Sequence, residues 1–208
     1  EEAIQQTKFE LIESLPSDGL GILNGDDEKQ KNYNIKNDCK IKWIGIDNKR
    51  VDCYAKDLEL SHKGTKFKVK FRGDDKEYPF ETKLLGRNNI YNILAGIVLG
   101  RELKISIKDL QKAVKRVAPT EHRLSMTKYY DINIIDDAYN SNPMGCKMAL
   151  EVLNMMPGKH IIVTPGMIEV GNKEDEVNKE FGRQIADNTY WWRKNKTNIW
   201  RINGKEIP

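Results

Sequence analysis

The hydrophobic pattern of this chain changes its period partway along, and that change limits the folds open to it. Across residues 40–82, apolar and polar side chains alternate in segments such as "KIKWIGI" and "KFKVKF", separated by the turn-like "HKGTK" and "RGDDKE". A period of two predicts a meander of half-exposed antiparallel strands. After "LLGRNN", apolar residues recur at helical spacing from Ile90 to Val98, which predicts an amphipathic helix. The chain is therefore predicted to be an α/β protein.

The segments on either side of this region extend the α/β pattern. We predict a first helix up to about Leu15, a short buried strand at "LGILN" and a further helix over "SIKDLQKAVKRVA". Beyond Pro119 come a strand at "YYDINIID", a helix after Pro143, a strand at "KHIIVTP" and a charged helix from about Lys173. Such alternation predicts a parallel sheet joined by βα crossovers. We place a domain boundary near Pro119.

The composition excludes several classes of protein. The 35 Lys and Arg residues nearly cancel the 31 Asp and Glu residues, and the net charge of +4 is spread along the chain, so we predict no nucleic-acid partner. No apolar run approaches the roughly 20 residues of a membrane span, and the first residues lack a signal-peptide pattern. The 3 cysteines are scattered, as is usual in a reducing compartment. These features predict a cytoplasmic protein without a membrane partner.

A cluster of short polar side chains, "DDAYNSNP", directly follows the predicted strand "DINII". In open α/β sheets, ligands gather beyond the carboxyl ends of the strands, so this cluster is placed to bind one. Asn142 and Pro143 also suit the cap and the first position of the next helix. From spacing alone, a ligand site and a capped loop without a ligand both remain open.

The same cluster closely resembles a signature of the Mur ligase family, in the branch that adds D-alanyl-D-alanine to UDP-N-acetylmuramoyl-tripeptide. Five other segments in the same order are also similar to that family: "KFELIESLP", "LNGDDE", "LLGRNNIYNILAG", "EHRLS" and "PGMIEVG". The resemblance covers residues 1 to about 187. It implies that residues 1–118 are the later part of a central ATPase domain with antiparallel strands. Residues 119–187 would then be the start of a Rossmann-like C-terminal domain.

The resemblance implies an ATP-dependent amide ligase of peptidoglycan synthesis, acting in the cytoplasm as a monomer. Such an enzyme uses ATP and Mg²⁺ to phosphorylate the carboxylate of UDP-N-acetylmuramoyl-tripeptide. The amine of D-alanyl-D-alanine then attacks the acyl phosphate. Because charge develops on phosphoryl and carbonyl oxygens, catalysis of this kind depends on cations and positioned hydrogen-bond donors.

The nucleotide contacts implied by the family fall on four residues. Asn89 and Asn92 match a pair near the adenine, and an amide can offer a base edge both a donor and an acceptor. Arg123 matches an arginine that reaches the terminal phosphate across the domain junction, and Asp137 matches an acid near the ribose. The alternatives are a helix-capping asparagine, a surface asparagine and a linker arginine in a surface ion pair. Asn88 departs from the pattern, since the family usually has histidine there.

Other residues of the motif are assigned to the peptide substrate or to support. The resemblance implies that Tyr139, Asn140 and Asn142 contact the substrate. His122 is expected to orient its neighbours rather than to react. Asp136 is expected to end the strand and to support the site.

The resemblance assigns catalytic roles to Arg123 and Lys8. Lys8 matches a lysine that relatives carry as a carbamate, an anion able to bind or position Mg²⁺. We therefore list Lys8 as a metal ligand only if it is carbamylated. From the sequence alone, Lys8 is a lysine on an amphipathic helix.

Two observations limit what the chain is expected to do. No phosphate-binding loop G-x-x-x-x-G-K-S/T is present, and "GMIEVGNK" has its lysine one position late, so we expect the chain alone not to ligate. Residues 188–208 lose all periodicity. If codons permitted for this tail are read with a shift of one nucleotide, the resulting peptide resembles the family's sequence after the strand expected here. We interpret this tail as an out-of-frame peptide; the alternative is a basic, aromatic, lineage-specific tail.

Two other readings of the whole chain remain open. The first is a non-catalytic nucleotide-binding remnant or pseudogene product. The second is another ATP-dependent amide ligase that shares the central fold. The diamino acid of the natural peptide substrate does not follow from the sequence.

Overall fold

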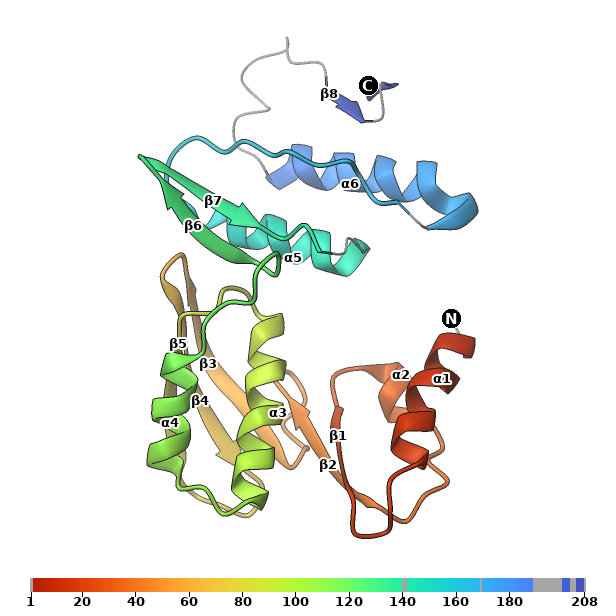
Figure 1. The fold of residues 1–208 in the computed structure, drawn as a ribbon, viewed down its shortest axis with the longest axis vertical. Helices are drawn as coiled ribbons and strands as arrows, with labels where there is room; N and C mark the ends of the chain where they lie inside the picture. Colours follow the sequence, from red (N-terminus) through yellow and green to blue (C-terminus); the bar gives the residue numbers. More distant parts are fainter. Residues whose placement is uncertain (1, 140–141, 169, 189–199, 203–204, 208) are drawn as a thin grey trace. The chain divides into compact units, whose positions relative to one another are not determined.

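The chain divides into two compact units, each described here by itself. The computed structural model describes residues 2–139, 142–168, 170–188, 200–202 and 205–207 (Figure 1). Unit 1 comprises Glu1–Glu59, Thr65–Thr82 and Arg87–Val117. Unit 2 comprises Leu60–Gly64, Lys83–Gly86 and Ala118–Pro208. None of the helices in the described ranges is long and apolar enough to cross a membrane.

A five-stranded mixed sheet forms the framework of unit 1, and its strands lie in chain order. The strands are β1 Leu20–Asn24, β2 Lys40–Gly45, β3 Cys53–Ser61, β4 Gly64–Phe71 and β5 Glu77–Thr82. Strands β4 and β5 pair antiparallel, as expected, with Phe67 opposite Phe80.

The predicted antiparallel meander is wrong at β2, which pairs parallel to both of its neighbours. Leu20 lies opposite Lys40 at the start of β1 and β2, and Ile44 lies opposite Cys53 where β2 meets β3. The reason is that a period of two reports which side chains face the core, and this pattern is the same for either strand direction.

The described helices of unit 1 are α1 Glu2–Glu13, α2 Glu28–Lys31, α3 Asn88–Glu102 and α4 Ile107–Arg116. Three of these four helices (α1, α3 and α4) were predicted, the short α2 was not, and the α/β class is confirmed. Helix α3 buries Ile90, Ile93, Leu94, Ile97 and Val98, and it packs on β1 and β2. Helix α4 begins at Ser106, whose hydroxyl accepts the backbone N–H of Asp109.

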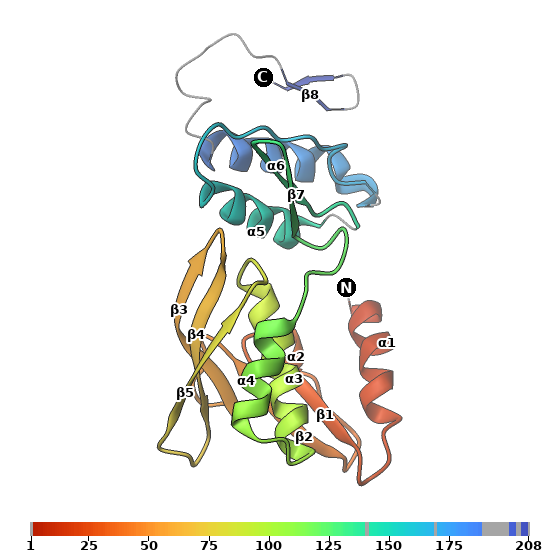
Figure 2. The ribbon, with the colours of Figure 1, turned by 60° about the vertical axis from the view of Figure 1, so that its left-hand side comes forward.

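Helices α3 and α4 approach each other closely because of one glycine. Figure 2 shows the two helices side by side against the strands. A Cβ atom at Gly100 would lie 2.5 Å from Cδ2 of Leu110. A larger residue at this position would therefore push α4 away from α3.

Helix α1 is held to the rest of unit 1 at its carboxyl end. The Asn37 side chain donates to the carbonyl oxygens of Ile12, Glu13 and Leu15 at 3.1, 3.0 and 2.7 Å. Carbonyl groups at the end of a helix lack the usual backbone donor four residues on, so the Asn37 amide acts as a side-chain cap at this end. One turn earlier, the rings of Phe9 and Tyr33 stack with centroids 3.8 Å apart.

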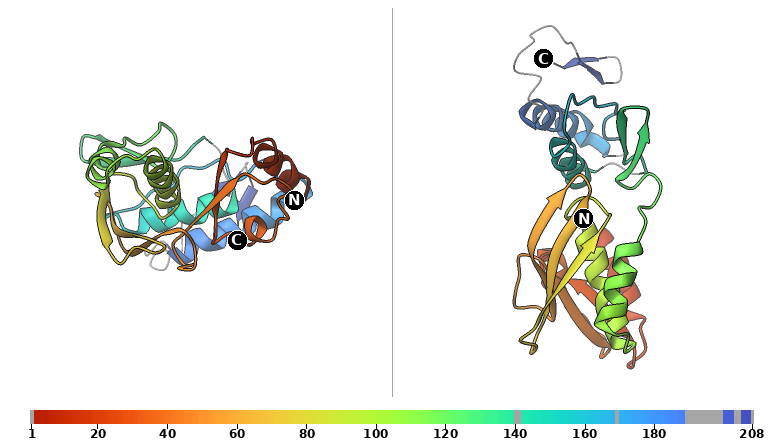
Figure 3. Two further views of the ribbon diagram at one scale, coloured as in Figure 1. Left: turned by 90° about the horizontal axis from the view of Figure 1, so that it is seen from below. Right: turned by 90° about the vertical axis from the view of Figure 1, so that its left-hand side faces the viewer.

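Unit 2 contains a hairpin, two long helices and a second short hairpin. Its elements are β6 Ser125–Tyr129, β7 Ile132–Asp136, α5 Pro143–Asn154, the 3₁₀ turn η1 Gly171–Lys173, α6 Glu174–Asn188, β8 Trp200–Ile202 and β9 Lys205–Ile207. Strands β6 and β7 pair antiparallel, and so do β8 and β9. Figure 3 shows the β6–β7 hairpin beside α5. Most of the tail at 188–208 lies outside the described residues.

The predicted parallel sheet of the later region is wrong for the residues that the structure describes. Strand β7 pairs only with β6, and "KHIIVTP" at residues 159–165 is not a strand. A side chain of α6 binds the backbone just beyond this segment. The Asn178 amide accepts the N–H of Met167 at 2.7 Å and donates to the Met167 carbonyl at 2.9 Å. The Asn178 side chain thus satisfies the backbone N–H and carbonyl of Met167, which a neighbouring strand would satisfy in a sheet.

Two apolar clusters form the core of unit 2, and α5 contributes to both. One contains Leu85, Leu124, Val152 and Met156, with Ile135 of β7 packed against it. The other contains Leu150, Met167 and Phe181. Because Leu124 and Ile135 join the first cluster, burial fixes the backbone of "EHRLS" and of the strand that leads into the polar motif.

We expect Asn178→Ala to destabilise unit 2 by about 2–3 kcal/mol, since it removes three hydrogen bonds, to Met167 N–H, Met167 carbonyl and Glu174 carbonyl, each worth about 1 kcal/mol. Urea denaturation followed by circular dichroism measures this loss. The matched control is Lys179→Ala at the exposed neighbouring position, expected to change stability by less than about 0.5 kcal/mol. Equal effects of the two variants would contradict this role of Asn178.

Candidate functional site

The predicted site residues of unit 2 lie on two segments that are joined by hydrogen bonds. His122 donates its Nδ1–H to Oδ2 of Asp136 at 2.7 Å, at the end of β7. Oδ1 of Asp137 accepts the Leu124 N–H at 3.0 Å. The Tyr139 N–H donates to the His122 carbonyl at 3.2 Å. The segment carrying "EHRLS" is thereby fixed against "DDAY".

Arg123 is presented from a strained part of the backbone. Its neighbours His122 and Leu124 have φ angles of 60° and 45°, in the left-handed region that costs L-residues roughly 1–2 kcal/mol each. The burial of Leu124 and the hydrogen bonds from His122 and Leu124 offset this cost. Strain of this kind is concentrated at functional sites.

The Arg123 side chain is exposed and lies on an aromatic ring. Its guanidinium carbon is 4.1 Å from the centre of the Tyr139 ring. Stacking on an aromatic face orients the plane of a guanidinium and leaves the edge with its N–H donors available. Sequence reasoning had assigned Tyr139 to the substrate and missed this contact with Arg123.

The two adjacent carboxylates have opposite electrostatic environments. The hydrogen bond from His122, and next that from the Ala138 N–H, hold the pKa of Asp136 below its usual value. Burial raises the pKa of Asp137, although the Leu124 N–H and the Arg123 charge partly oppose it. Asp136 is thus a stable anion with a structural partner. The charged form of Asp137 is destabilised by burial, and a further hydrogen-bond donor would stabilise it.

The helix cap predicted at Asn142 is confirmed. Oδ1 of Asn142 accepts the Gly145 N–H at 2.9 Å, and Pro143 begins α5. The contact of Asn142 with a substrate stays a prediction, as does that of Tyr139. Asn140 lies outside the described residues.

The predicted adenine contacts belong to unit 1, on the first turns of α3. Asn89 is half-buried and Asn92 is exposed, and their spacing of three places them on one side of the helix. Asn88, where the sequence departs from the family pattern, is exposed. The sequence-predicted residues therefore fall into two groups, one in each unit.

Lys8 is exposed in the middle of α1. Ile4 and Leu11 share its face of the helix and are 63% and 71% exposed. Within the ranges that the structure describes, no group of three or more His, Cys, Asp and Glu side chains is placed to bind a metal ion.

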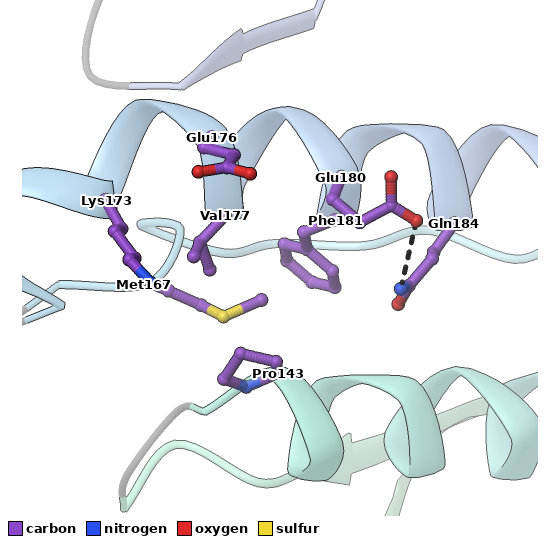
Figure 4. Close-up of a pocket in the computed structure, with 8 residues that line it drawn as sticks. All are labelled: Pro143, Met167, Lys173, Glu176, Val177, Glu180, Phe181 and Gln184. Carbon is purple, nitrogen blue, oxygen red and sulfur yellow. Dashed lines mark hydrogen bonds between the residues drawn. The ribbon is translucent and has the colours of Figure 1, made fainter. Parts of the chain in front are cut away.

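A cavity of about 300 Å³ lies between the start of α5 and α6. Met167, Val177 and Phe181 form its apolar surface, and Lys173, Glu176 and Glu180 lie around it (Figure 4). Apart from Asn140, which lies outside the described residues, none of the predicted site residues lines this cavity. It is therefore not the place where the sequence motifs put a nucleotide.

Sequence reasoning also missed Asp26 in unit 1, whose carboxylate accepts hydrogen bonds from three consecutive backbone N–H groups. The available signal was the acidic turn "NGDDE" directly after a buried strand. That position in an α/β fold commonly holds residues that organise neighbouring loops.

Comparison with known proteins adds three findings. Residues 1–100 match the family model of the Mur ligase middle domain. The chain is 31% identical over 188 residues to the UDP-N-acetylmuramoyl-tripeptide–D-alanyl-D-alanine ligase of Bacillus subtilis strain 168. The aligned region covers 89% of this chain and 39% of that protein. The chain thus spans about two fifths of the length of the curated relatives that it matches.

Solved structures share the fold. The crystal structure of MurF from Acinetobacter baumannii superposes with a TM-score of 0.76 at 21% identity, over 89% of this chain and 40% of that one. The structure of MurF ligase from Thermotoga maritima in complex with ADP gives a TM-score of 0.75 at 22% identity, over 88% and 42% of the two chains.

We expect Asp137→Asn not to destabilise unit 2 near pH 7, because the amide oxygen can still accept from Leu124 while the charge is removed. The folded-state pKa of Asp137 lies above its ordinary 3.8, so the charge reduces stability as the pH rises through that pKa. Any advantage of the variant should therefore disappear as the pH falls below about 3.8, where both states are protonated.

Urea denaturation at about pH 7 and about pH 3.5 measures this difference, with Asp131→Asn in the exposed hairpin turn as the control. A variant that loses more stability at neutral than at acid pH would show that the Asp137 charge is itself stabilising.

Proposed function

Because the chain belongs to the Mur ligase family, as its six motifs predicted, we propose that it supplies nucleotide contacts in an ATP-dependent amide ligase. The intact enzyme would join D-alanyl-D-alanine to UDP-N-acetylmuramoyl-tripeptide in peptidoglycan synthesis, using ATP and Mg²⁺. The match to the Bacillus subtilis ligase supports this substrate pair. Since the chain spans about two fifths of that relative, the complete reaction is proposed for the whole protein.

The observation that carries this proposal is the way in which the Arg123 side chain is held. Its guanidinium lies on the Tyr139 ring, between two residues held in left-handed conformations. A planar, permanently charged group fixed in this way suits a phosphoryl group, whose oxygens gain charge in the transition state. A linker arginine in an ordinary ion pair would need neither the strain nor the stacking.

The Asp137 carboxylate is proposed to accept a hydrogen bond from a ribose hydroxyl. Burial raises its pKa, and the backbone N–H of Leu124 only partly opposes this effect. A hydroxyl donor from a ligand would stabilise the charged form, so binding and ionisation would favour each other. Its neighbour Asp136 would take no part in binding, because His122 already uses its carboxylate.

Asn89 and Asn92 are proposed to recognise the adenine. Each amide can donate and accept one hydrogen bond along a base edge. Tyr139, Asn140 and Asn142 are proposed to face the peptide substrate. For Asn142 this role falls to its Nδ2 group, because its oxygen caps α5.

Lys8 is proposed as a site of carbamylation. Its exposure leaves the amine accessible to carbon dioxide, and a carbamate would provide one oxygen ligand for Mg²⁺. The bound ion would neutralise phosphate charge in the intact enzyme. The described side chains provide no further group of ligands, so no step of the reaction is assigned to the metal through this chain.

We expect Arg123→Ala to weaken ATP binding to the chain about 10- to 100-fold, the effect of losing a charged hydrogen-bonding partner worth about 1.5–3 kcal/mol. Adenosine, which lacks phosphates, should bind equally to the variant and the original chain. Titration followed by ¹⁵N–¹H NMR measures both affinities, even in the millimolar range.

The control for this experiment is Lys128→Ala, which removes an exposed cation from β6 of the same unit. If Arg123→Ala and Lys128→Ala bound ATP equally well, the phosphate role of Arg123 would be excluded. Absence of saturable binding of ATP to the original chain would overturn the proposal as a whole.

A further inference from the structure

We propose that Asp26, Tyr91 and Arg87 act as positioning residues that fix the first turns of α3 and hence the amides of Asn89 and Asn92. The inference rests on the proposed adenine contact of those asparagines. All five residues belong to unit 1.

The carboxylate of Asp26 organises the loop between β2 and β3. Oδ2 accepts the N–H groups of Ile46 at 2.6 Å and Asp47 at 3.0 Å, and Oδ1 accepts that of Asn48 at 2.6 Å. Only glycine fits at the end of β2 beside this carboxylate, since a Cβ atom at Gly45 would lie 3.2 Å from Oδ1 of Asp26 and 2.7 Å from the Asn48 carbonyl oxygen.

The same carboxylate is bonded to α3. The hydroxyl of Tyr91, one turn into the helix, donates to Oδ2 of Asp26 at 2.8 Å. Burial raises the pKa of Tyr91 to about 12, and its hydrogen bond to Asp26 adds to this effect. The hydroxyl therefore keeps its proton and remains a donor at any physiological pH.

Burial alone would raise the pKa of Asp26. The hydrogen bonds from Ile46, Asn48, Asp47 and Tyr91 outweigh that effect, so the pKa lies below its usual value. Asp26 is thus an anion whose acceptor capacity is largely used by the protein, which makes it a structural anchor rather than a ligand-binding group.

Arg87 joins the start of α3 to the same loop. Its Nη2 lies 2.6 Å from Oδ2 of Asp47. Burial opposes the charge of the guanidinium, but Asp47 and Tyr91 raise the pKa of Arg87 above its usual value. The loop bound by Asp26 is therefore tied to α3 at two residues one turn apart.

Helix α3 depends on this network because its start lacks the usual cap. Arg87 occupies the cap position, and no side chain there accepts a backbone N–H of the first turn. The buried apolar residues of α3 hold it against the sheet, but apolar packing is not directional. The hydrogen bond from Tyr91 to Asp26 is directional, and recognition of a base edge requires placement to about 0.5 Å.

Tyr91→Phe tests the inference because it removes the one hydroxyl that joins Asp26 to α3 and keeps the ring. We expect the variant to bind adenosine about 5- to 10-fold more weakly than the original chain, measured by NMR titration. The side-chain amide resonances of Asn89 and Asn92 should also shift in the free variant.

Tyr78→Phe is the matched control. It removes another Tyr–Asp hydrogen bond of unit 1, from Tyr78 to Asp74 at 2.7 Å, near Phe71 and the Arg101 end of α3. We expect it to lose as much thermal stability as Tyr91→Phe while keeping adenosine affinity within about twofold. A purely structural role for Tyr91 would give equal affinities for the two variants and would overturn the inference.

Asn92→Ala separates this result from a failure of the proposed function. If Asn92→Ala weakens adenosine binding but Tyr91→Phe behaves like Tyr78→Phe, the positioning role is wrong and the adenine contact stands. If Asn92→Ala and Asn89→Ala both bind adenosine like the original chain, the adenine contact is wrong, and the inference fails with it.

Discussion

Each unit of this chain depends on an aspartate that follows a β-strand and accepts backbone N–H groups from a loop distant in sequence. In unit 1, Asp26 follows β1 and binds the loop after β2. In unit 2, Asp137 follows β7 and binds the N–H of Leu124. A buried loop must satisfy its backbone donors somewhere, and a carboxylate at the end of a strand satisfies them from a rigid position. In each unit, the segment fixed in this way supports a side chain proposed to contact the nucleotide.

Burial acts to raise the pKa of both aspartates, but hydrogen bonds outweigh this effect only at Asp26. This difference separates their roles. Asp26 receives three backbone hydrogen bonds and one from Tyr91, and its pKa is lowered despite burial. Among the residues that the structure describes, Leu124 donates the one backbone hydrogen bond to Asp137, and burial raises the pKa of Asp137. The first carboxylate is satisfied by the protein, whereas the second gains stability from any further donor. This is why we assign anchoring to Asp26 and ligand contact to Asp137.

Local features of the structure could be predicted from the sequence, and long-range ones could not. The buried face of α3, the Ser106 cap and the Asn142 cap follow from spacing and from residues within one turn. The parallel direction of β2 and the missing strand at residues 159–165 depend on pairings between distant segments, such as Asn178 with Met167. For the same reason the motifs identified Arg123 and Asp137, but not the Tyr139 ring beneath Arg123 or the network around Asp26.

We propose that α3, rather than the cavity between α5 and α6, binds the adenine of the nucleotide. Intermolecular nuclear Overhauser effects between ADP and the isotope-labelled chain test it most directly. The account predicts contacts from the adenine protons to the side-chain amides of Asn89 and Asn92. Contacts from adenine to the methyl group of Met167 in the α5–α6 cavity, with none to α3, would contradict it.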